Sequence, residues 1–111
     1  MSINYDGNQL FIYGKSLSFN DPIRSIKEYK NLVLVLLAVP SGKINNRNVY
    51  AINREDTDIY WQIEEPDLIY EDCPYTNFIE NNNQIIIGNW NGITYLIDEK
   101  NGKRIGAIQT K

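Results

Sequence analysis

The stretch from residue 83 to residue 102 constrains the fold most, because two strand-like runs follow one another and each ends in a turn signal. Ile85–Gly88 and Ile93–Ile97 are rich in β-branched residues, which are frequent in strands. Asn91-Gly92 lies between the two runs, and Asn-Gly is typical of a hairpin with a type I′ turn. Asn101-Gly102 offers the next turn. We therefore predict an antiparallel meander here, with the other strands added around it.

Further short apolar runs, separated by turn residues, extend this prediction to the whole chain of 111 residues. The runs are Ile3–Tyr5, Gln9–Tyr13, Leu17–Phe19, Leu32–Val39, Asn48–Asn53, Ile59–Ile63, Tyr75–Glu80 and Lys103–Gln109. Their spacing predicts one all-β or nearly all-β domain over residues 1–111, of about eight to ten strands. An antiparallel β-sandwich and a strongly twisted meander both fit this pattern.

Two neighbouring segments differ in how clearly they can be interpreted. Leu32–Val39 is continuously apolar, which is typical of a central strand covered on both faces. Ile23–Lys30 has apolar residues at three-residue spacing after Asp21-Pro22, a pair that can begin a helix. A short helix near residues 22–30 and an extended connection therefore both remain open.

The two tryptophans occupy different sequence contexts. Trp61 alternates with Ile59 and Ile63, so we expect these three side chains to face one way and Trp61 to lie in the core. Trp90 precedes Asn91-Gly92 at a hairpin tip, where a large aromatic residue is often exposed. Tryptophan is a favoured anchor in protein interfaces, so Trp90 is a candidate contact residue.

Charge is unevenly distributed along the chain. Residues 48–99 carry eleven acids and one base, whereas the segments before and after have an excess of bases. Residues 64–72 alone contain five acids and no base. A block of one sign often marks an interaction surface, although it also serves simply to keep a small protein in solution.

The residues needed for common catalytic chemistry are missing from the sequence. The chain has no histidine, which removes the commonest general base and metal ligand. Its single cysteine, Cys73, lies among acids that disfavour a thiolate. Asp56-Thr57-Asp58 lacks the central glycine and further ligands of a calcium loop. We expect no enzymatic activity, no metal and no cofactor.

Compartment and partner class follow from similar reasoning. A single cysteine and an N-terminus without a basic or apolar region favour a cytoplasmic protein. The longest apolar run has nine residues, well short of the roughly 20 that span a bilayer. The acidic half is unsuited to nucleic acid, because such binding relies on basic contacts to phosphate. We therefore expect neither a membrane nor a nucleic acid as partner.

A weak internal repeat relates residues 50–61 to residues 95–106 without gaps. At this offset Tyr50 matches Tyr95, Ile52 matches Ile97 and Asn53 matches Asp98. The residues that fit the family pattern are Tyr50, Ala51, Ile52 and Trp61 in the first copy and Tyr95, Ile97, Asp98 and Gly102 in the second, with Thr57 at the glycine position of the first copy and Gly106 at the tryptophan position of the second. Both copies resemble the quinoprotein-type propeller repeat, over roughly residues 31–109. The resemblance implies a hairpin geometry, since two such units are too few to close a ring.

In size, acidity and lack of catalytic residues, the chain resembles the immunity proteins of bacterial toxin–immunity pairs, including those of contact-dependent growth inhibition. This resemblance implies a heterodimer with a cognate toxin, and a nuclease is the first expectation for that toxin. An acidic face of this chain would cover the basic active site of the toxin. The expected partner-binding residues are Asp56, Asp58, Glu64, Glu65, Asp67, Tyr70, Glu71, Asp72 and Trp90.

Two other function classes stay open from the sequence. The hairpins could pair through their edges and make the chain a structural or assembly module. Alternatively, the tyrosine and tryptophan side chains could line a site for a carbohydrate or another ligand. Neither alternative requires catalysis.

Overall fold

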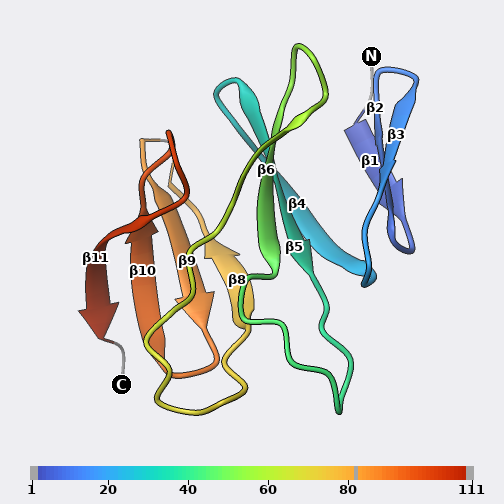
Figure 1. Ribbon diagram of the computed structural model, residues 1–111. Helices are drawn as coiled ribbons and strands as arrows, with labels where there is room; N and C mark the ends of the chain where they lie inside the picture. The colour runs from blue at the N-terminus through green and yellow to red at the C-terminus, as the bar shows by residue number, and fades with distance from the viewer. Residues whose placement is uncertain (1–2, 82, 110–111) are drawn as a thin grey trace.

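The computed structural model describes residues 3–81 and 83–109, which form eleven strands and no helix (Figure 1). The strands are β1 (Ile3–Asp6), β2 (Gln9–Ile12), β3 (Lys15–Ser18), β4 (Ile23–Tyr29), β5 (Leu32–Leu37), β6 (Val49–Asn53), β7 (Ile59–Gln62), β8 (Tyr75–Ile79), β9 (Ile85–Asn89), β10 (Ile93–Ile97) and β11 (Arg104–Gln109). The predicted all-β antiparallel class is confirmed. No long apolar helix of the kind that crosses a bilayer occurs in these residues.

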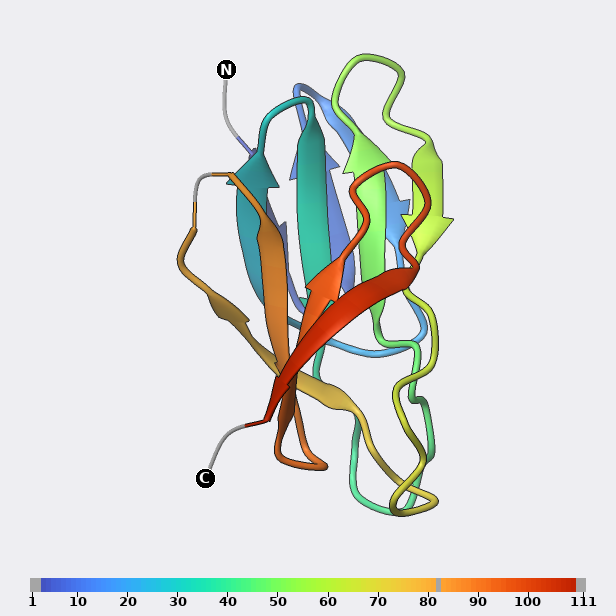
Figure 2. The same cartoon turned by 90° about the vertical axis from the view of Figure 1, so that its left-hand side faces the viewer.

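The strands form three antiparallel meanders stacked as layers. The first sheet is β1–β3, the second is β4–β7, and the third is β8–β11, each in sequence order. Figures 1 and 2 show the second sheet between the other two. The sequence left a β-sandwich and a strongly twisted meander open, and the structure has three packed sheets, the first of them built from the N-terminal hairpins.

Strand β5 is the centre of the stack, and all six of its side chains are buried. Leu32, Leu34 and Leu36 belong to the core between the second and third sheets. Their neighbours Val33, Val35 and Leu37 belong to the core between the first and second sheets. Alternate side chains of a strand point to opposite faces, so the continuous apolar run serves two cores. The predicted doubly covered strand is confirmed.

The sequence left open whether residues 22–30 form a short helix or an extended segment. Strand β4 shows that they are extended, because Ile23–Tyr29 pairs with β5. A register shift between Ile23 and Ser25 places Ile23 and Ile26 in the same core. Tyr29 lies in the other core. The three-residue step from Ile23 to Ile26 therefore comes from a β-bulge, which inserts one residue into the alternation, and not from a helix. The equal step from Ile26 to Tyr29 is ordinary strand alternation, which puts the two side chains on opposite faces.

The β9–β10 hairpin has the predicted position but a different turn. Gly92 has a positive φ of 89°, whereas Asn91 is not among the residues with positive φ, so the turn is not type I′. The Gly92 amide donates to the Asn89 carbonyl at 3.0 Å. This arrangement is typical of a three-residue loop in which a type I turn is followed by a left-handed glycine.

The predicted orientation of Ile59 is wrong, because a second bulge lies in β7. The register of β6 and β7 shifts between Ala51 and Ile52. Trp61 and Ile63 are buried in the core toward the third sheet, as expected, but Ile59 is 52% exposed. The extra residue in β7 reverses the side on which Ile59 lies.

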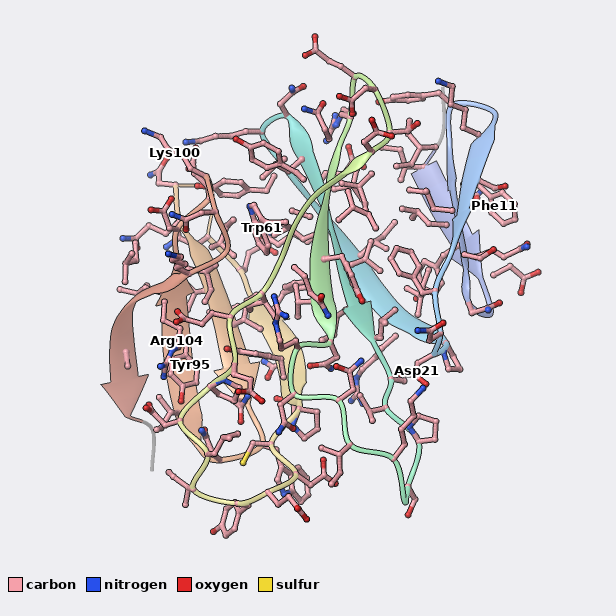
Figure 3. All side chains as sticks on the ribbon, viewed as in Figure 1. Phe11, Asp21, Trp61, Tyr95, Lys100 and Arg104 are labelled. Carbon is pink, nitrogen blue, oxygen red and sulfur yellow. The ribbon has the colours of Figure 1, made fainter. Side chains whose placement is uncertain are left out.

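Trp61 joins the second sheet to the turn between β10 and β11 (Figure 3). Its Nε1 donates to the carbonyl of Glu99 at 2.9 Å. Its ring lies so close to Gly102 that a Cβ added there would be 2.6 Å from Cε3. The two copies of the sequence repeat therefore contact each other through these residues. Thr57 and Gly102, which align in the repeat, share a positive φ of 59° and 77°.

Replacing Gly102 with alanine tests this contact. The new Cβ would overlap the Trp61 ring and occupy a left-handed conformation, so we expect a loss of about 2–4 kcal/mol in the free energy of unfolding. Urea unfolding measures this loss. Gly42→Ala is the matched control, because Gly42 has a φ of 88° and nothing within 4 Å of an added Cβ. Equal losses in both variants would contradict the packing role of Gly102.

Replacing Thr57 with glycine should have the opposite effect. Thr57 is β-branched and has a φ of 59°, a conformation that costs such residues energy. Its backbone amide bond to the Asn53 carbonyl, at 2.8 Å, does not need the side chain. We expect Thr57→Gly to stabilise the fold by roughly 0.5–1 kcal/mol in the same assay. A destabilised variant would show that the threonine hydroxyl matters more than the strain.

Candidate protein-binding surface

The acidic segment 64–74 connects β7 to β8 and lies at one end of the molecule, beside the β9–β10 turn (Figures 1 and 2). Two buried asparagines hold it there. Asn46 Nδ2 donates to the Glu71 carbonyl at 2.8 Å, and Asn46 Oδ1 accepts the Cys73 amide at 2.8 Å. Asn89 Nδ2 donates to the Cys73 carbonyl at 3.0 Å. Buried amides of this kind satisfy backbone groups that would otherwise be left without partners.

Asn48 anchors the end of the same segment. Its Nδ2 donates to the carbonyls of Leu37 and Tyr75, both at 2.9 Å, and its Oδ1 accepts the Tyr75 amide at 2.8 Å. The Tyr75 hydroxyl donates to the Glu64 carbonyl at 2.8 Å, and burial raises the pKa of Tyr75 above its usual value. Both ends of the segment are thus fixed to the framework.

Four large side chains project from this framework into solvent. Leu68, Ile69 and Tyr70 are 53%, 56% and 57% exposed, and Trp90 is 68% exposed. The Trp90 amide donates to the Pro74 carbonyl at 3.0 Å, which ties the hairpin tip to the acidic segment. Exposed aromatic and aliphatic residues grouped on fixed backbone are typical of protein-binding surfaces.

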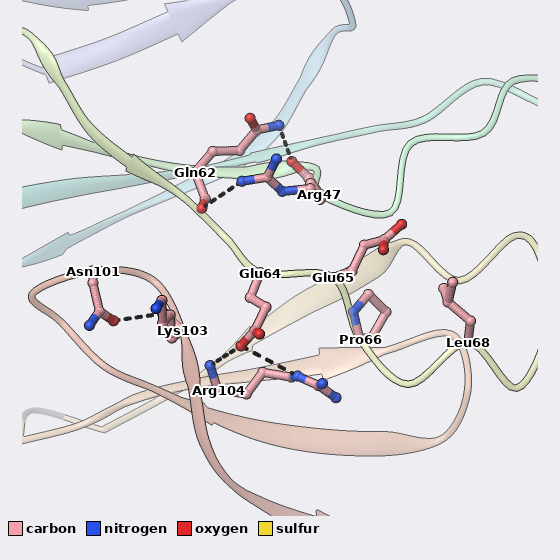
Figure 4. A pocket seen from close by; sticks show the side chains of 9 residues that line it. All are labelled: Arg47, Gln62, Glu64, Glu65, Pro66, Leu68, Asn101, Lys103 and Arg104. Atoms are coloured by element: carbon pink, nitrogen blue, oxygen red, sulfur yellow. Dashed lines mark hydrogen bonds and ion pairs between the residues drawn. The ribbon is translucent and has the colours of Figure 1, made fainter.

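Two of the predicted acids are used within the molecule, because Arg104 binds both Glu64 and Asp67; Figure 4 shows the contact with Glu64. Glu64 Oε1 accepts the Arg104 amide at 2.8 Å and lies 3.6 Å from its Nε. Asp67 Oδ1 lies 3.0 Å from Arg104 Nη1, and its Oδ2 accepts the Tyr95 hydroxyl at 3.0 Å. Hydrogen bonds from Arg104 and then Tyr95 hold the pKa of the Asp67 carboxyl below its usual range.

Three other predicted acids remain available. Glu65, Glu71 and Asp72 are exposed, and their carboxylates form no ion pair or hydrogen bond within residues 3–81 and 83–109. We define the end surface as the exposed residues of this region that Arg104 does not bind: Glu65, Leu68, Ile69, Tyr70, Glu71, Asp72 and Trp90.

The remaining two acids do not belong to the end surface. Asp56 and Asp58 lie in the turn between β6 and β7, at the opposite end of the molecule (Figures 1 and 2). Asp56 Oδ1 accepts the Asp58 amide at 2.9 Å, so that carboxylate stabilises its own turn. The nine predicted residues therefore do not form one face.

Two pockets border the end surface. One, of about 490 Å³, lies beside Glu64 and Glu65 and is also lined by Lys103 and Arg104 (Figure 4). The other, of about 540 Å³, is lined by Asp72 and Trp90 together with Arg24, Leu37, Ala38, Val39, Pro74, Tyr75 and Thr76. The sequence did not single out Arg24 or Arg104. Nothing in the sequence around Arg104 indicates that it binds Glu64 and Asp67, and nothing around Arg24 indicates that it lies beside the pocket with Asp72 and Trp90.

The chemistry that the end surface offers follows from the side chains in and around it. Cys73 is buried, and its Sγ donates to the Tyr70 carbonyl at 3.0 Å. Within the described ranges, no three His, Cys, Asp or Glu side chains are grouped so as to hold a metal ion. What the surface presents is carboxylates beside large apolar and aromatic side chains, a combination suited to a partner with basic and apolar groups.

The fold is that of a three-layer antiparallel β protein. The chain belongs to the family described as Domain of unknown function (DUF7957), whose family model matches residues 1–107. The crystal structure of the computationally designed Ika8 protein is similar, with a TM-score of 0.62 and 10% sequence identity over 98% of this chain. The chain spans 36% of the length of that designed protein. A search of curated proteins finds no match.

The Asp67 contacts predict a pH-dependent contribution to stability. Because the folded pKa of Asp67 is lowered, its contribution is complete above the unfolded value of about 4 and is lost as pH falls further. Urea unfolding should therefore show wild type more stable than Asp67→Asn at pH 7, with the two converging toward pH of about 2. Asp72→Asn is the control and should match wild type. A difference between wild type and Asp67→Asn that persists undiminished at low pH would contradict the ionic origin.

Proposed function

We propose that this chain is a non-catalytic inhibitor of the immunity type, which binds a cognate toxin and covers a basic active site with the end surface. A nuclease is the first candidate, because its site must attract phosphate and is therefore basic. The observation that carries the proposal is the grouping of unpaired Glu71 and Asp72 with exposed Tyr70 and Trp90 on anchored backbone.

The arrangement of charges supports this assignment in a narrower form than the sequence suggested. Glu64 and Asp67 hold the segment in place through Arg104, so they shape the surface without facing the partner. Glu65, Glu71 and Asp72 are left to attract it. Unpaired charges around an apolar centre speed association with an oppositely charged protein, while buried aromatic anchors slow dissociation.

Rigidity also favours a binding role. Asn46, Asn48 and Asn89 fix the backbone on both sides of the exposed residues. A surface that is already ordered loses little conformational entropy on binding, which favours affinity.

The test uses the product of the reading frame beside the gene for this chain. We expect that product to arrest growth when expressed alone and to bind the wild-type chain stoichiometrically, with growth restored. Trp90→Ala should weaken binding at least about tenfold. Glu71→Lys combined with Asp72→Lys should slow association and reduce its dependence on salt.

Asp56→Lys combined with Asp58→Lys is the matched control, because it makes the same charge change at the opposite end of the molecule. This control should keep wild-type affinity and protection. A neighbouring product that is harmless and does not bind would contradict the assignment of a toxin as the partner. Equal losses of affinity in the two double variants would contradict the placement of the binding site on the end surface.

A further inference from the structure

A groove runs between β4 and β8, the edge strands of the second and third sheets on the same side of the molecule (left in Figure 2). It consists of two adjoining cavities of about 540 Å³ and 380 Å³. Arg24 and Thr76 line both cavities, so the cavities meet at these two side chains. The larger cavity also reaches Asp72 and Trp90. The groove is therefore continuous with the end surface.

The strands on either side of the groove offer backbone groups to an extended chain. Each has a hydrogen-bonded neighbour on one side only, and alternate residues of such a strand direct their N–H and C=O groups away from that neighbour. The Leu37 amide donates to the Asn48 carbonyl, so Val35, two residues earlier on β5, also bonds toward β6. Ile26 faces Val35 and therefore directs its backbone groups outward. Extended peptides bind to edge strands through groups of this kind.

Two bases line the groove, and they differ in how they are paired. Lys27 Nζ lies 3.1 Å from Glu80 Oε1, so that charge is neutralised within the chain. Arg24 is exposed, and its guanidinium forms no ion pair or hydrogen bond within residues 3–81 and 83–109. Its carbonyl accepts the Tyr5 hydroxyl at 3.0 Å, which fixes its backbone to the first sheet. A carboxylate is the natural complement of such a guanidinium.

The larger cavity adds an apolar surface beside Arg24. Its floor contains Leu37, Ala38, Val39 and Pro74. The side chain of Trp90 borders it and is 68% exposed. An apolar side chain of a partner would lose contact with water here on binding, which favours association.

We propose that the groove holds an extended segment of the partner protein, with an acidic side chain on Arg24 and an apolar side chain on the floor beside Trp90. The inference rests on the proposed function, because it extends the contact with the toxin from the end surface along β8. Strand β8 has five residues, so at about 3.3 Å a residue the segment in contact has about five residues as well.

The sign of the effect at Arg24 separates this inference from simple attraction between an acidic chain and a basic partner. Attraction alone predicts that added negative charge preserves or strengthens binding. Arg24→Glu should instead weaken binding of the neighbouring gene's product at least about tenfold, because it brings two carboxylates together. Arg24→Gln should weaken it less. Lys15→Glu is the matched control, because it makes the same charge change on β3, outside the groove, and it should not weaken binding.

Hydrogen exchange on the wild-type complex gives a second measurement that needs no substitution. Amides of residues 24–27 and 76–79 should exchange more slowly on binding. Amides of residues 59–62 should not change, because β7 is the edge strand at the other side of the second sheet.

Circular dichroism first shows which variants fold, and either Arg24 variant suffices for the test. Binding that Glu71→Lys with Asp72→Lys weakens, but that neither Arg24 variant weakens, would overturn this inference and leave the proposed function standing. A neighbouring product that does not bind would overturn both. Slower exchange in the groove as the isolated chain is concentrated would assign the groove to a second copy, and would also overturn this inference.

Discussion

Burial of β5 on both faces is the constraint on which the rest of the structure depends. Three leucines of this strand meet the third sheet, and three alternating residues meet the first. The second sheet can lie between two others only because its central strand has no polar side chain on either face. The end surface depends on this arrangement, because Asn48 connects the last residue of β5 to the first residue of β8.

Polar contacts then fix how the third sheet meets the second. Trp61 and Tyr29 reach from the second sheet to Glu99, whose Oε1 accepts the Tyr29 hydroxyl at 2.9 Å. At the other end of this interface, Arg104 holds Glu64 and Asp67. The acidic segment therefore has two roles. Some of its carboxylates join the layers, and the others remain on the surface where a partner can reach them.

Local patterns predicted much of the fold, because turn residues and apolar alternation act over a few positions. They located the hairpins and the doubly covered strand. They failed at Ile59 and left the β4 segment open between helix and strand, and in both places a single bulge residue shifts the alternation. The site was harder to predict, because charge pairing joins distant residues. Nothing near Arg104 in the sequence indicates that it binds Glu64 and Asp67, or that Asp56 and Asp58 lie at the opposite end.

Hydrogen exchange on the complex with the neighbouring gene's product tests the central claim most directly, because it maps the contact without any substitution. We expect slower exchange on binding at amides of residues 65–72 and at Trp90 and Asn91, with no change at residues 55–58. Protection confined to the 55–58 turn or to the N-terminal sheet, with the acidic segment unchanged, would contradict it.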